Sequence, residues 1–170
     1  HPTTQIVTMN DTGSKVSKRK PDSSIVQGIK LVKNQKADAF ISAGHTGAVM
    51  ATSLFLLGRI PHVKRPALGA YLPTKSGGKI LCDVGANPDA KPIHLLQFAI
   101  MASMYLDHVE GINDIKIGLI NIGTEPTKGS KMYLETFDLL EKELPNFIGN
   151  VESRNLFDCE ANVLVCDGFV

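Results

Sequence analysis

The segment Ser42-Ala43-Gly44-His45-Thr46-Gly47 places two glycines and two hydroxyl side chains just before an apolar stretch. Gly44 and Gly47 allow the backbone to approach an anion closely, and the hydroxyls of Ser42 and Thr46 can donate hydrogen bonds. A helix that begins near Gly47 would direct its free N–H groups and positive dipole end into this turn. The segment therefore has the chemistry of a phosphate-binding turn, although helix capping alone would use the same residues.

Three further turns follow apolar runs in a similar way. They are Asp83-Val84-Gly85-Ala86-Asn87, Asn121-Ile122-Gly123-Thr124-Glu125 and Asp167-Gly168. Open α/β sheets bind ligands at the carboxyl ends of their strands, so the four turns together predict one composite cleft. Asn87 and Asn121 are candidates for polarising a carbonyl group there. Lys128 is a candidate for compensating negative charge.

The carboxylates of these turns have two open readings. Asp83, Glu125 and Asp167 could contact a substrate, or they could hold loop N–H groups in place by accepting their hydrogen bonds. His45 is the one histidine within a candidate turn. It could orient a phosphate or donate to a developing oxyanion, and an ordinary surface histidine is an equal alternative.

Several other chemistries lack support in the sequence. The remaining histidines are scattered, so neither a zinc site nor any other metal site is predicted. The nucleotide-binding glycine motifs and the Gly-x-Ser-x-Gly elbow of serine hydrolases are absent. Lys and Arg total 18 against 17 Asp and Glu, which gives no electrostatic case for binding nucleic acid. No run of 18 apolar residues occurs that could form a membrane-spanning helix.

The cysteines and the basic residues point to the environment of the protein. Three cysteines without Cys-x-x-Cys spacing suggest buried free thiols in a reducing, cytoplasmic compartment. A basic run near the N-terminus would usually be a solvated face, with contact to an anionic partner as the alternative. That run consists of Lys15, Lys18, Arg19 and Lys20.

The order of apolar runs and turns predicts an α/β fold. Short strands are expected at 5–8, 39–42, 66–72, 79–83, 116–121, 147–151 and 162–166. Helices are expected from about 24 to 35, 48–57, 95–108 and 131–144. Nearly continuous apolar strands indicate a mainly parallel sheet covered on both faces, that is, a three-layer α/β/α sandwich. The turn at 74–78 could make a hairpin that pairs Tyr71 with Ile80 antiparallel.

Nine blocks of sequence, in this order, closely resemble the bacterial phosphate acyltransferases of phospholipid synthesis, the PlsX family. These blocks are Lys20-Pro21-Asp22-Ser23-Ser24, Ser42-Ala43-Gly44-His45-Thr46-Gly47-Ala48, Arg65-Pro66-Ala67-Leu68, Asp83-Val84-Gly85-Ala86-Asn87, Leu95-Leu96-Gln97-Phe98-Ala99-Ile100-Met101, Gly118-Leu119-Ile120-Asn121-Ile122-Gly123-Thr124-Glu125, Lys128-Gly129, Asn146-Phe147-Ile148-Gly149-Asn150-Val151-Glu152 and Val165-Cys166-Asp167-Gly168-Phe169. The resemblance covers nearly the whole chain. It departs at His45, where the family usually has Asn.

The resemblance implies a fold like that of isocitrate and isopropylmalate dehydrogenases and related to phosphotransacetylases. It implies transfer of a fatty acyl group from acyl carrier protein to inorganic phosphate, which gives an acyl phosphate for glycerol-3-phosphate acylation. No cofactor is expected. The resemblance also implies a cytoplasmic homodimer that is peripherally associated with the membrane. Association with a membrane-bound glycerol-3-phosphate acyltransferase is a further expectation of the resemblance. Residues 1–170 would form the central part of a single domain whose terminal segments lie outside this chain.

The resemblance also implies a role for each site residue. Phosphate binding is expected from Ser42, Gly44, Thr46 and Gly47, and catalysis from His45, Asn87, Asn121 and Lys128. An acidic carrier protein would need a basic docking patch, for which the N-terminal cations and Lys64-Arg65 are the available clusters. The alternatives are a phosphotransacetylase or phosphotransbutyrylase that uses acyl-coenzyme A, and a non-catalytic scaffold for lipid-synthesis enzymes. A nicotinamide-dependent dehydrogenase is a more distant alternative.

Overall fold

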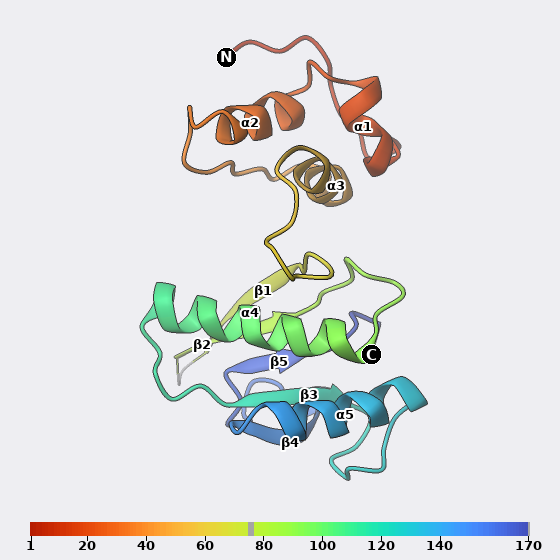
Figure 1. The fold of residues 1–170 in the computed structure, drawn as a ribbon, viewed down its shortest axis with the longest axis vertical. Coiled ribbons are helices and arrows are strands. Elements are labelled where there is room, and N and C mark those ends of the chain that lie inside the picture. Colours follow the sequence, from red (N-terminus) through yellow and green to blue (C-terminus); the bar gives the residue numbers. More distant parts are fainter. Residues whose placement is uncertain (75–76, 170) are drawn as a thin grey trace. The chain divides into compact units, whose positions relative to one another are not determined.

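The computed structural model describes residues 1–74 and 77–169, and the chain divides into two compact units, His1–Pro66 and Ala67–Val170 (Figure 1). The first unit is helical and the second contains the sheet. Each unit is described by itself.

The first unit packs three helices around one small apolar cluster. These helices are α1 (Gly13–Arg19), α2 (Ser24–Lys33) and α3 (Thr46–Leu56). The predicted α2 and α3 are confirmed. The apolar residues of α2 recur at helical spacing and face the cluster, whereas α3 contributes Ala48 and leaves Phe55 60% exposed. The buried members of the cluster are Val16, Ile25, Val26, Ile29 and Ala48. The sequence predicts no helix over 13–19, because Val16 is the one buried residue that this polar segment contributes to α1.

The strands expected at 5–8 and 39–42 are wrong. Gln5 makes only an isolated bridge with Ser23, and residues 39–42 pair with no strand in the described part of the chain. Ile41 is 94% exposed, whereas the ring of Phe40 lies on Gly28 of α2, where a Cβ atom would come within 2.3 Å of it. The apolar character of this segment therefore reflects one anchor on a helix and not a buried strand.

The second unit is built on a five-stranded, mainly parallel sheet in the order β1-β2-β5-β3-β4. Its strands are β1 (Gly69–Thr74), β2 (Gly77–Cys82), β3 (Ile117–Asn121), β4 (Phe147–Glu152) and β5 (Val163–Val165). Only β1 and β2 are antiparallel, and Tyr71 lies opposite Ile80 as the sequence predicts. The predicted turn between them includes positions 75–76, which lie outside the described residues.

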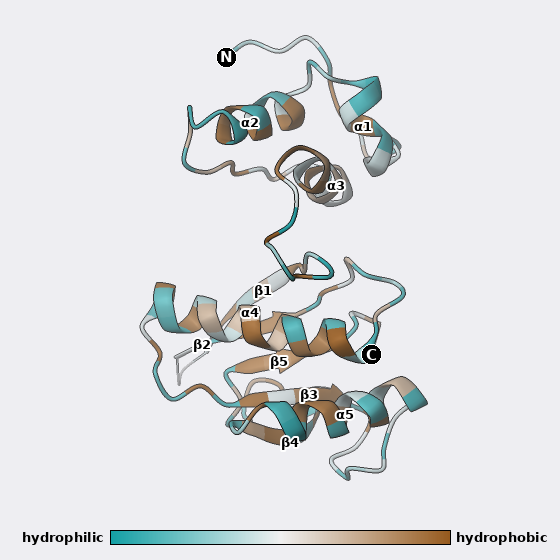
Figure 2. Ribbon diagram, viewed as in Figure 1, coloured by the Kyte–Doolittle hydropathy of each residue, from teal (hydrophilic) through white to brown (hydrophobic). Residues whose placement is uncertain are grey.

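Helices α4 (Pro92–Glu110) and α5 (Lys131–Glu143) cover one face of this sheet (Figure 1). Strands β3 and β5 are strongly hydrophobic and fully buried, as expected for central parallel strands (Figure 2). The opposite face packs on the segment that contains η1 (Ser153–Asn155) through Leu156, Cys159 and Ala161. The α/β class is thus confirmed, and in this unit the described residues place helices on one face of the sheet. No helix in the described part of the chain is long and apolar enough to cross a membrane.

Candidate functional site

Three of the four polar turns lie at one edge of the sheet. Strands β2, β5 and β3 are adjacent and parallel, so Asp83, Asp167 and Asn121 all lie at or just beyond the carboxyl ends. Backbone hydrogen bonds continue past the strands, with Asp83 N donating to Cys166 O over 3.0 Å. Helices α4 and α5 each begin after the loop that follows β2 or β3, so their N-termini are directed toward the same edge. The prediction of a shared edge is therefore confirmed for these three turns.

The Asp83 carboxylate organises the loop that follows β2. It is fully buried, and its Oδ1 accepts from Leu68 N over 2.8 Å. Its Oδ2 accepts from Ala86 N, Asn87 N and Asn87 Nδ2 over 2.9–3.0 Å. Both oxygens are therefore occupied, and this geometry favours the loop-organising reading over substrate contact. Asn87 is also buried and is held by the same carboxylate.

A pair of buried asparagines organises the loop that follows β3. Asn121 Nδ2 donates to Asn150 Oδ1 over 3.2 Å and to Lys128 O over 3.0 Å, and its Oδ1 accepts from Ile122 N. Asn150 Nδ2 in turn donates to Glu125 O over 2.8 Å. Both amide hydrogens of Asn121 are thus engaged, so in this conformation Asn121 shapes the loop and offers no donor for a carbonyl.

Sequence reasoning missed Asn150 because it lies inside an otherwise apolar strand segment. An asparagine between Gly149 and Val151 in a buried strand requires hydrogen-bond partners for its side-chain amide, and this requirement is the signal that could have identified it. Tyr133 was missed for a related reason, since it occupies a core position of α5. Its hydroxyl lies 3.0 Å from Asp167 Oδ1.

The loops after β2 and β5 meet through two glycines. A Cβ atom on Gly168 would lie 2.2 Å from Gly85 N, and both glycines have positive φ angles, +83° and +100°. Asp167 Oδ1 also accepts from Phe169 N over 2.9 Å, which turns the chain after β5. A side chain at residue 168 would prevent this approach, whereas at residue 85 glycine is favoured by the positive φ angle and not by lack of space.

The ionisable groups of this edge include one free cation and two neutral thiols. The Lys128 side chain is exposed and its ammonium has no carboxylate within ion-pair distance among the described residues. Burial raises the pKa of the Cys82 thiol to about 12, and burial also raises the pKa of Cys166, whose Sγ donates to Asp83 O. Burial likewise raises the pKa of the Tyr133 hydroxyl. Neither thiol is a thiolate nucleophile at neutral pH.

The fourth turn, at the start of α3, belongs to the His1–Pro66 unit and follows no strand. Ser42 and Thr46 are exposed, and Ser42 Oγ accepts from Gly44 N over 3.1 Å. The amides of Thr46 and Gly47, the first two of the helix, have no hydrogen-bond partner in the described part of the chain. The turn therefore holds two backbone donors without a partner among the described residues and two hydroxyls of exposed residues, the donor set of an anion site.

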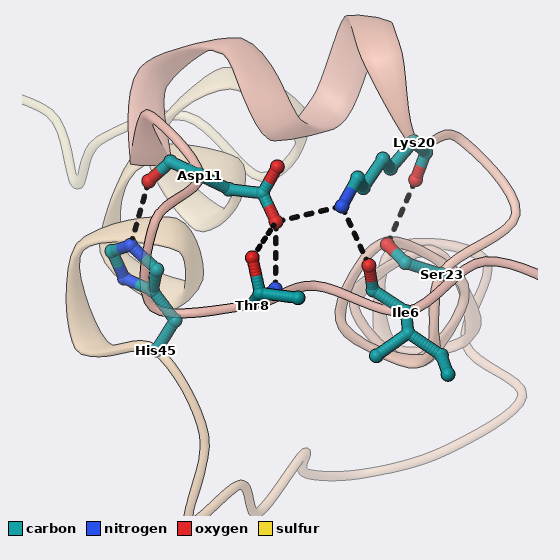
Figure 3. Close-up of polar contacts among 6 residues, drawn as sticks. All are labelled: Ile6, Thr8, Asp11, Lys20, Ser23 and His45. Carbon is teal, nitrogen blue, oxygen red and sulfur yellow. Dashed lines mark hydrogen bonds and ion pairs between the residues drawn. The ribbon is translucent and has the colours of Figure 1, made fainter.

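His45 caps α3 and connects it to the loop before α1. Its Nδ1 accepts from Ala48 N over 3.2 Å, and its Nε2 lies 2.9 Å from Asp11 O (Figure 3). A carbonyl accepts only, so in this arrangement Nε2 donates to Asp11 O while Nδ1 accepts from Ala48 N. Both ring nitrogens are engaged, which makes His45 a positioning residue in this conformation and gives it no free group for acid–base catalysis.

The loop that His45 contacts is held by a small polar cluster. Asp11 Oδ2 accepts from Lys20 Nζ over 2.7 Å and from the backbone and hydroxyl of Thr8 (Figure 3). Lys20 Nζ also donates to Ile6 O, so this cation is already bound and is unavailable to an external anion. These bonds, led by that from Lys20, lower the pKa of Asp11 to about 2. Gly13 completes the packing, because a Cβ atom there would lie 2.6 Å from the carbonyl carbon of Gly47.

The candidate residues thus form two groups, each within its own unit. The sheet edge holds Asp83, Asn87, Asn121, Glu125, Lys128 and Asp167, and the α3 turn holds Ser42, Gly44, His45, Thr46 and Gly47. In neither group, among the described residues, do three His, Cys, Asp or Glu side chains gather closely enough to hold a metal ion. The chemistry that these groups can support is anion binding and hydrogen-bond donation.

Comparison with known proteins places the chain in a family. A family model described as "Fatty acid synthesis protein" matches residues 1–170, and the chain belongs to that family. Curated relatives named phosphate acyltransferase include those of Halothermothrix orenii, 52% identical over 99% of this chain, and Desulfitobacterium hafniense strain DCB-2, 54% identical over 98%. The chain spans about half the length of these relatives, 51% and 50% respectively.

A solved structure supports the fold class. The EutD phosphotransacetylase from Staphylococcus aureus matches with a TM-score of 0.59 and 20% sequence identity, over 82% of this chain and 49% of that one. At this identity the likeness concerns the fold alone. It agrees with the predicted relation to the phosphotransacetylase fold.

Proposed function

We propose that the full-length protein transfers a fatty acyl group from acyl carrier protein to inorganic phosphate and releases an acyl phosphate. The observation that carries this proposal is the family membership, with about 50% identity to phosphate acyltransferases along the whole chain. The donor set at the α3 turn supports it, because two hydroxyls and two backbone amides without a partner among the described residues suit a phosphate ion. The polar sheet edge adds loops that are held by buried hydrogen bonds and that carry the exposed Lys128 side chain.

The proposed reaction needs no covalent enzyme intermediate. An oxygen of hydrogen phosphate attacks the thioester carbonyl carbon, and the carbonyl electrons move to oxygen to form a tetrahedral oxyanion. When these electrons return, the carbon–sulfur bond breaks and the carrier thiolate takes up the proton released by the phosphate. The atoms balance as acyl thioester plus hydrogen phosphate giving acyl phosphate plus carrier thiol. The protonated state of Cys82 and Cys166 agrees with direct attack by phosphate.

The residues of the chain have distinct roles in this scheme. The amides of Thr46 and Gly47 and the hydroxyls of Ser42 and Thr46 bind the phosphate, while the approach permitted by Gly44 keeps the turn open. Lys128 offsets negative charge that develops at the carbonyl oxygen. Asp83, Asn87, Asn121, Glu125 and Asp167 act by shaping the loops, and His45 acts by capping α3.

The carrier protein would dock on exposed cations of α1. Lys15, Lys18 and Arg19 are exposed, whereas Lys20 is held by Asp11. An acidic carrier would be attracted by such a patch, and its Michaelis constant would rise with ionic strength. A cytoplasmic homodimer at the membrane surface, beside a glycerol-3-phosphate acyltransferase that consumes the acyl phosphate, is part of the same proposal.

The test compares two acyl donors with and without phosphate. Full-length protein is mixed with palmitoyl-carrier protein or palmitoyl-coenzyme A, and acyl phosphate is trapped with hydroxylamine. We expect that acyl phosphate forms only when phosphate is present and that more of it forms from the carrier thioester than from the coenzyme A thioester. A preference for coenzyme A would indicate a phosphotransacetylase, and no phosphate-dependent loss of either thioester would indicate a scaffold.

A further inference from the structure

A cavity of about 340 Å³ lies between the β1–β2 hairpin and helix α4. Its sheet side is formed by Gly69, Tyr71, Ile80 and Cys82, with Ala67 just before β1, and its helix side by Met101, Ala102 and Tyr105. Apart from the two tyrosine hydroxyls, the side chains that line it carry no oxygen or nitrogen. All of these residues belong to the Ala67–Val170 unit.

Small residues keep this cavity open. Gly69, Tyr71, Ile80 and Cys82 share the sheet face that α4 covers, because Gly69 pairs with Cys82 and Tyr71 with Ile80. A Cβ atom on Gly69 would meet only Ile80 Cγ2, at an ordinary distance of 3.5 Å. The space above Gly69 is therefore large enough for further atoms, and among the described residues no side chain other than that of Ile80 and the chain neighbours lies within 4 Å of the added carbon.

One end of the cavity adjoins the polar sheet edge. Cys82 directly precedes Asp83, whose carboxylate holds both Leu68 N and the loop that contains Asn87. Val84 N also donates to Leu68 O over 3.0 Å, which brings that loop against the segment that carries Ala67 and Gly69. The other end has a rim of Tyr71 and Tyr105, which are 44% and 45% exposed. An occupant would have its polar end at the Asp83 loop and its apolar part along α4.

We propose that this cavity binds the hydrocarbon chain of the acyl group and that residue 69 limits the chain length accepted. The inference rests on the proposed function for the identity of the ligand. A fatty acyl chain has the required form, because it joins a reacting polar head to an apolar tail. Its burial in an apolar site strengthens binding by about fourfold for each methylene group.

The decisive variant fills the cavity from the sheet. Gly69→Val places a branched side chain into it at a strand position where valine is well tolerated. Ala70→Val is the matched control, because residue 70 is the next residue of β1 and points to the opposite face. Thermal unfolding of both variants of the full-length protein verifies that each retains its fold. The rates are then measured with decanoyl and palmitoyl thioesters of carrier protein.

Gly69→Val should lower kcat/KM for palmitoyl relative to decanoyl substrate by roughly fifteenfold, the effect of excluding about two methylene groups. Ala70→Val should leave the ratio near that of the wild type. A separate measurement follows the binding of cis-parinaric acid, a fluorescent fatty acid, which Gly69→Val should weaken and Ala70→Val should not. If the two variants give equal chain-length ratios and equal probe binding, the inference is overturned.

The probe also separates the two proposals. If Gly69→Val weakens probe binding but the protein forms no acyl phosphate, the acyl site is supported and the proposed function is contradicted. Conversely, the protein could form acyl phosphate while neither probe binding nor the chain-length ratio changes on substitution of residue 69. That result would support the proposed function and contradict this acyl site.

Discussion

Asn121 at the end of β3 donates its side-chain amide to Asn150 of the neighbouring strand β4 over 3.2 Å. Each of the two asparagines also reaches one end of the loop that carries Glu125 and Lys128, through the carbonyl oxygens of those residues. The loop is thus closed by a buried amide pair, so its conformation is fixed by side chains that belong to strands β3 and β4.

Removal of Asn150 should open this loop. Asn150→Ala leaves one amide hydrogen of Asn121 and the Glu125 carbonyl without partners, and a buried polar group in that state costs about 1–3 kcal/mol. We expect the free energy of unfolding, measured with urea, to fall by about 2 kcal/mol. Asn155→Ala, at an exposed position in η1, is the control and should change it by less than about 0.5 kcal/mol. Equal effects of the two substitutions would contradict the role of the pair.

The contact between Gly168 and Gly85 should make Gly168→Ala severe. A methyl group there meets backbone atoms 2.2 Å away and also carries the cost of a positive φ angle. Gly111→Ala is a matched control, since Gly111 has a φ of +69° but no atom within 4 Å of the added carbon. We expect about 1 kcal/mol of destabilisation at Gly111 and at least about twice that at Gly168, by urea denaturation. Similar values would show that the backbone contact is unimportant.

The Asp11–Lys20 ion pair should give an acid-dependent contribution to stability. The folded-state pKa of Asp11 is lowered from 3.8 to about 2, mainly by the hydrogen bond from Lys20 and then by that from Thr8. A depressed folded-state pKa means that the contribution is complete above about pH 4 and is lost as the pH falls through about 2. Wild type should therefore be more stable than Asp11→Asn at neutral pH, and the gap should close toward pH 2.

Urea midpoints measured across that range check this prediction. Asp38→Asn, an exposed substitution in the same unit, should show little difference from wild type at any of these pH values. A gap between wild type and Asp11→Asn that widens on acidification would contradict the assignment.

His45 acts as a cap, so its replacement should be rescued by another capping residue. His45→Ala removes the acceptor of Ala48 N and should cost about 1 kcal/mol. His45→Asn supplies an amide oxygen in its place and should recover most of the stability and of the phosphate-dependent rate. A rate that stays low in a fully stable His45→Asn variant would instead indicate that the imidazole itself takes part in the reaction.

The periodicity of the sequence predicts the helices and the central strands, because each of these elements buries an apolar face whose spacing is visible in the chain. The pairing of Tyr71 with Ile80 also follows from the sequence, since glycines bound a short turn between two strand-like runs. Other features depend on tertiary partners that the local pattern does not contain. Phe40 is anchored on Gly28 of a helix, and α1 has Val16 as its one buried residue.

The sequence predicts where the polar residues of the sheet edge lie better than it predicts the role of each side chain. Three strand ends meet as expected, because parallel strands share a carboxyl edge. The role of each polar side chain depends on which donors surround it, and no local pattern specifies those donors. Thus Asn121 is committed to Asn150 and Lys128 O, and His45 to Asp11 O and Ala48 N.

The dependence of the rate on phosphate concentration tests the central claim most directly. In the full-length protein, the double variant Ser42→Ala with Thr46→Ala removes both hydroxyls of the α3 turn and leaves its backbone and the His45 cap unchanged. Ser53→Ala, near the other end of α3, is the control. If the turn binds the phosphate, the Michaelis constant for phosphate should rise about tenfold or more, because hydrogen bonds to charged groups contribute about 1.5–3 kcal/mol. The constant for the acyl donor should change little, and an unchanged constant for phosphate in a folded double variant would contradict the account.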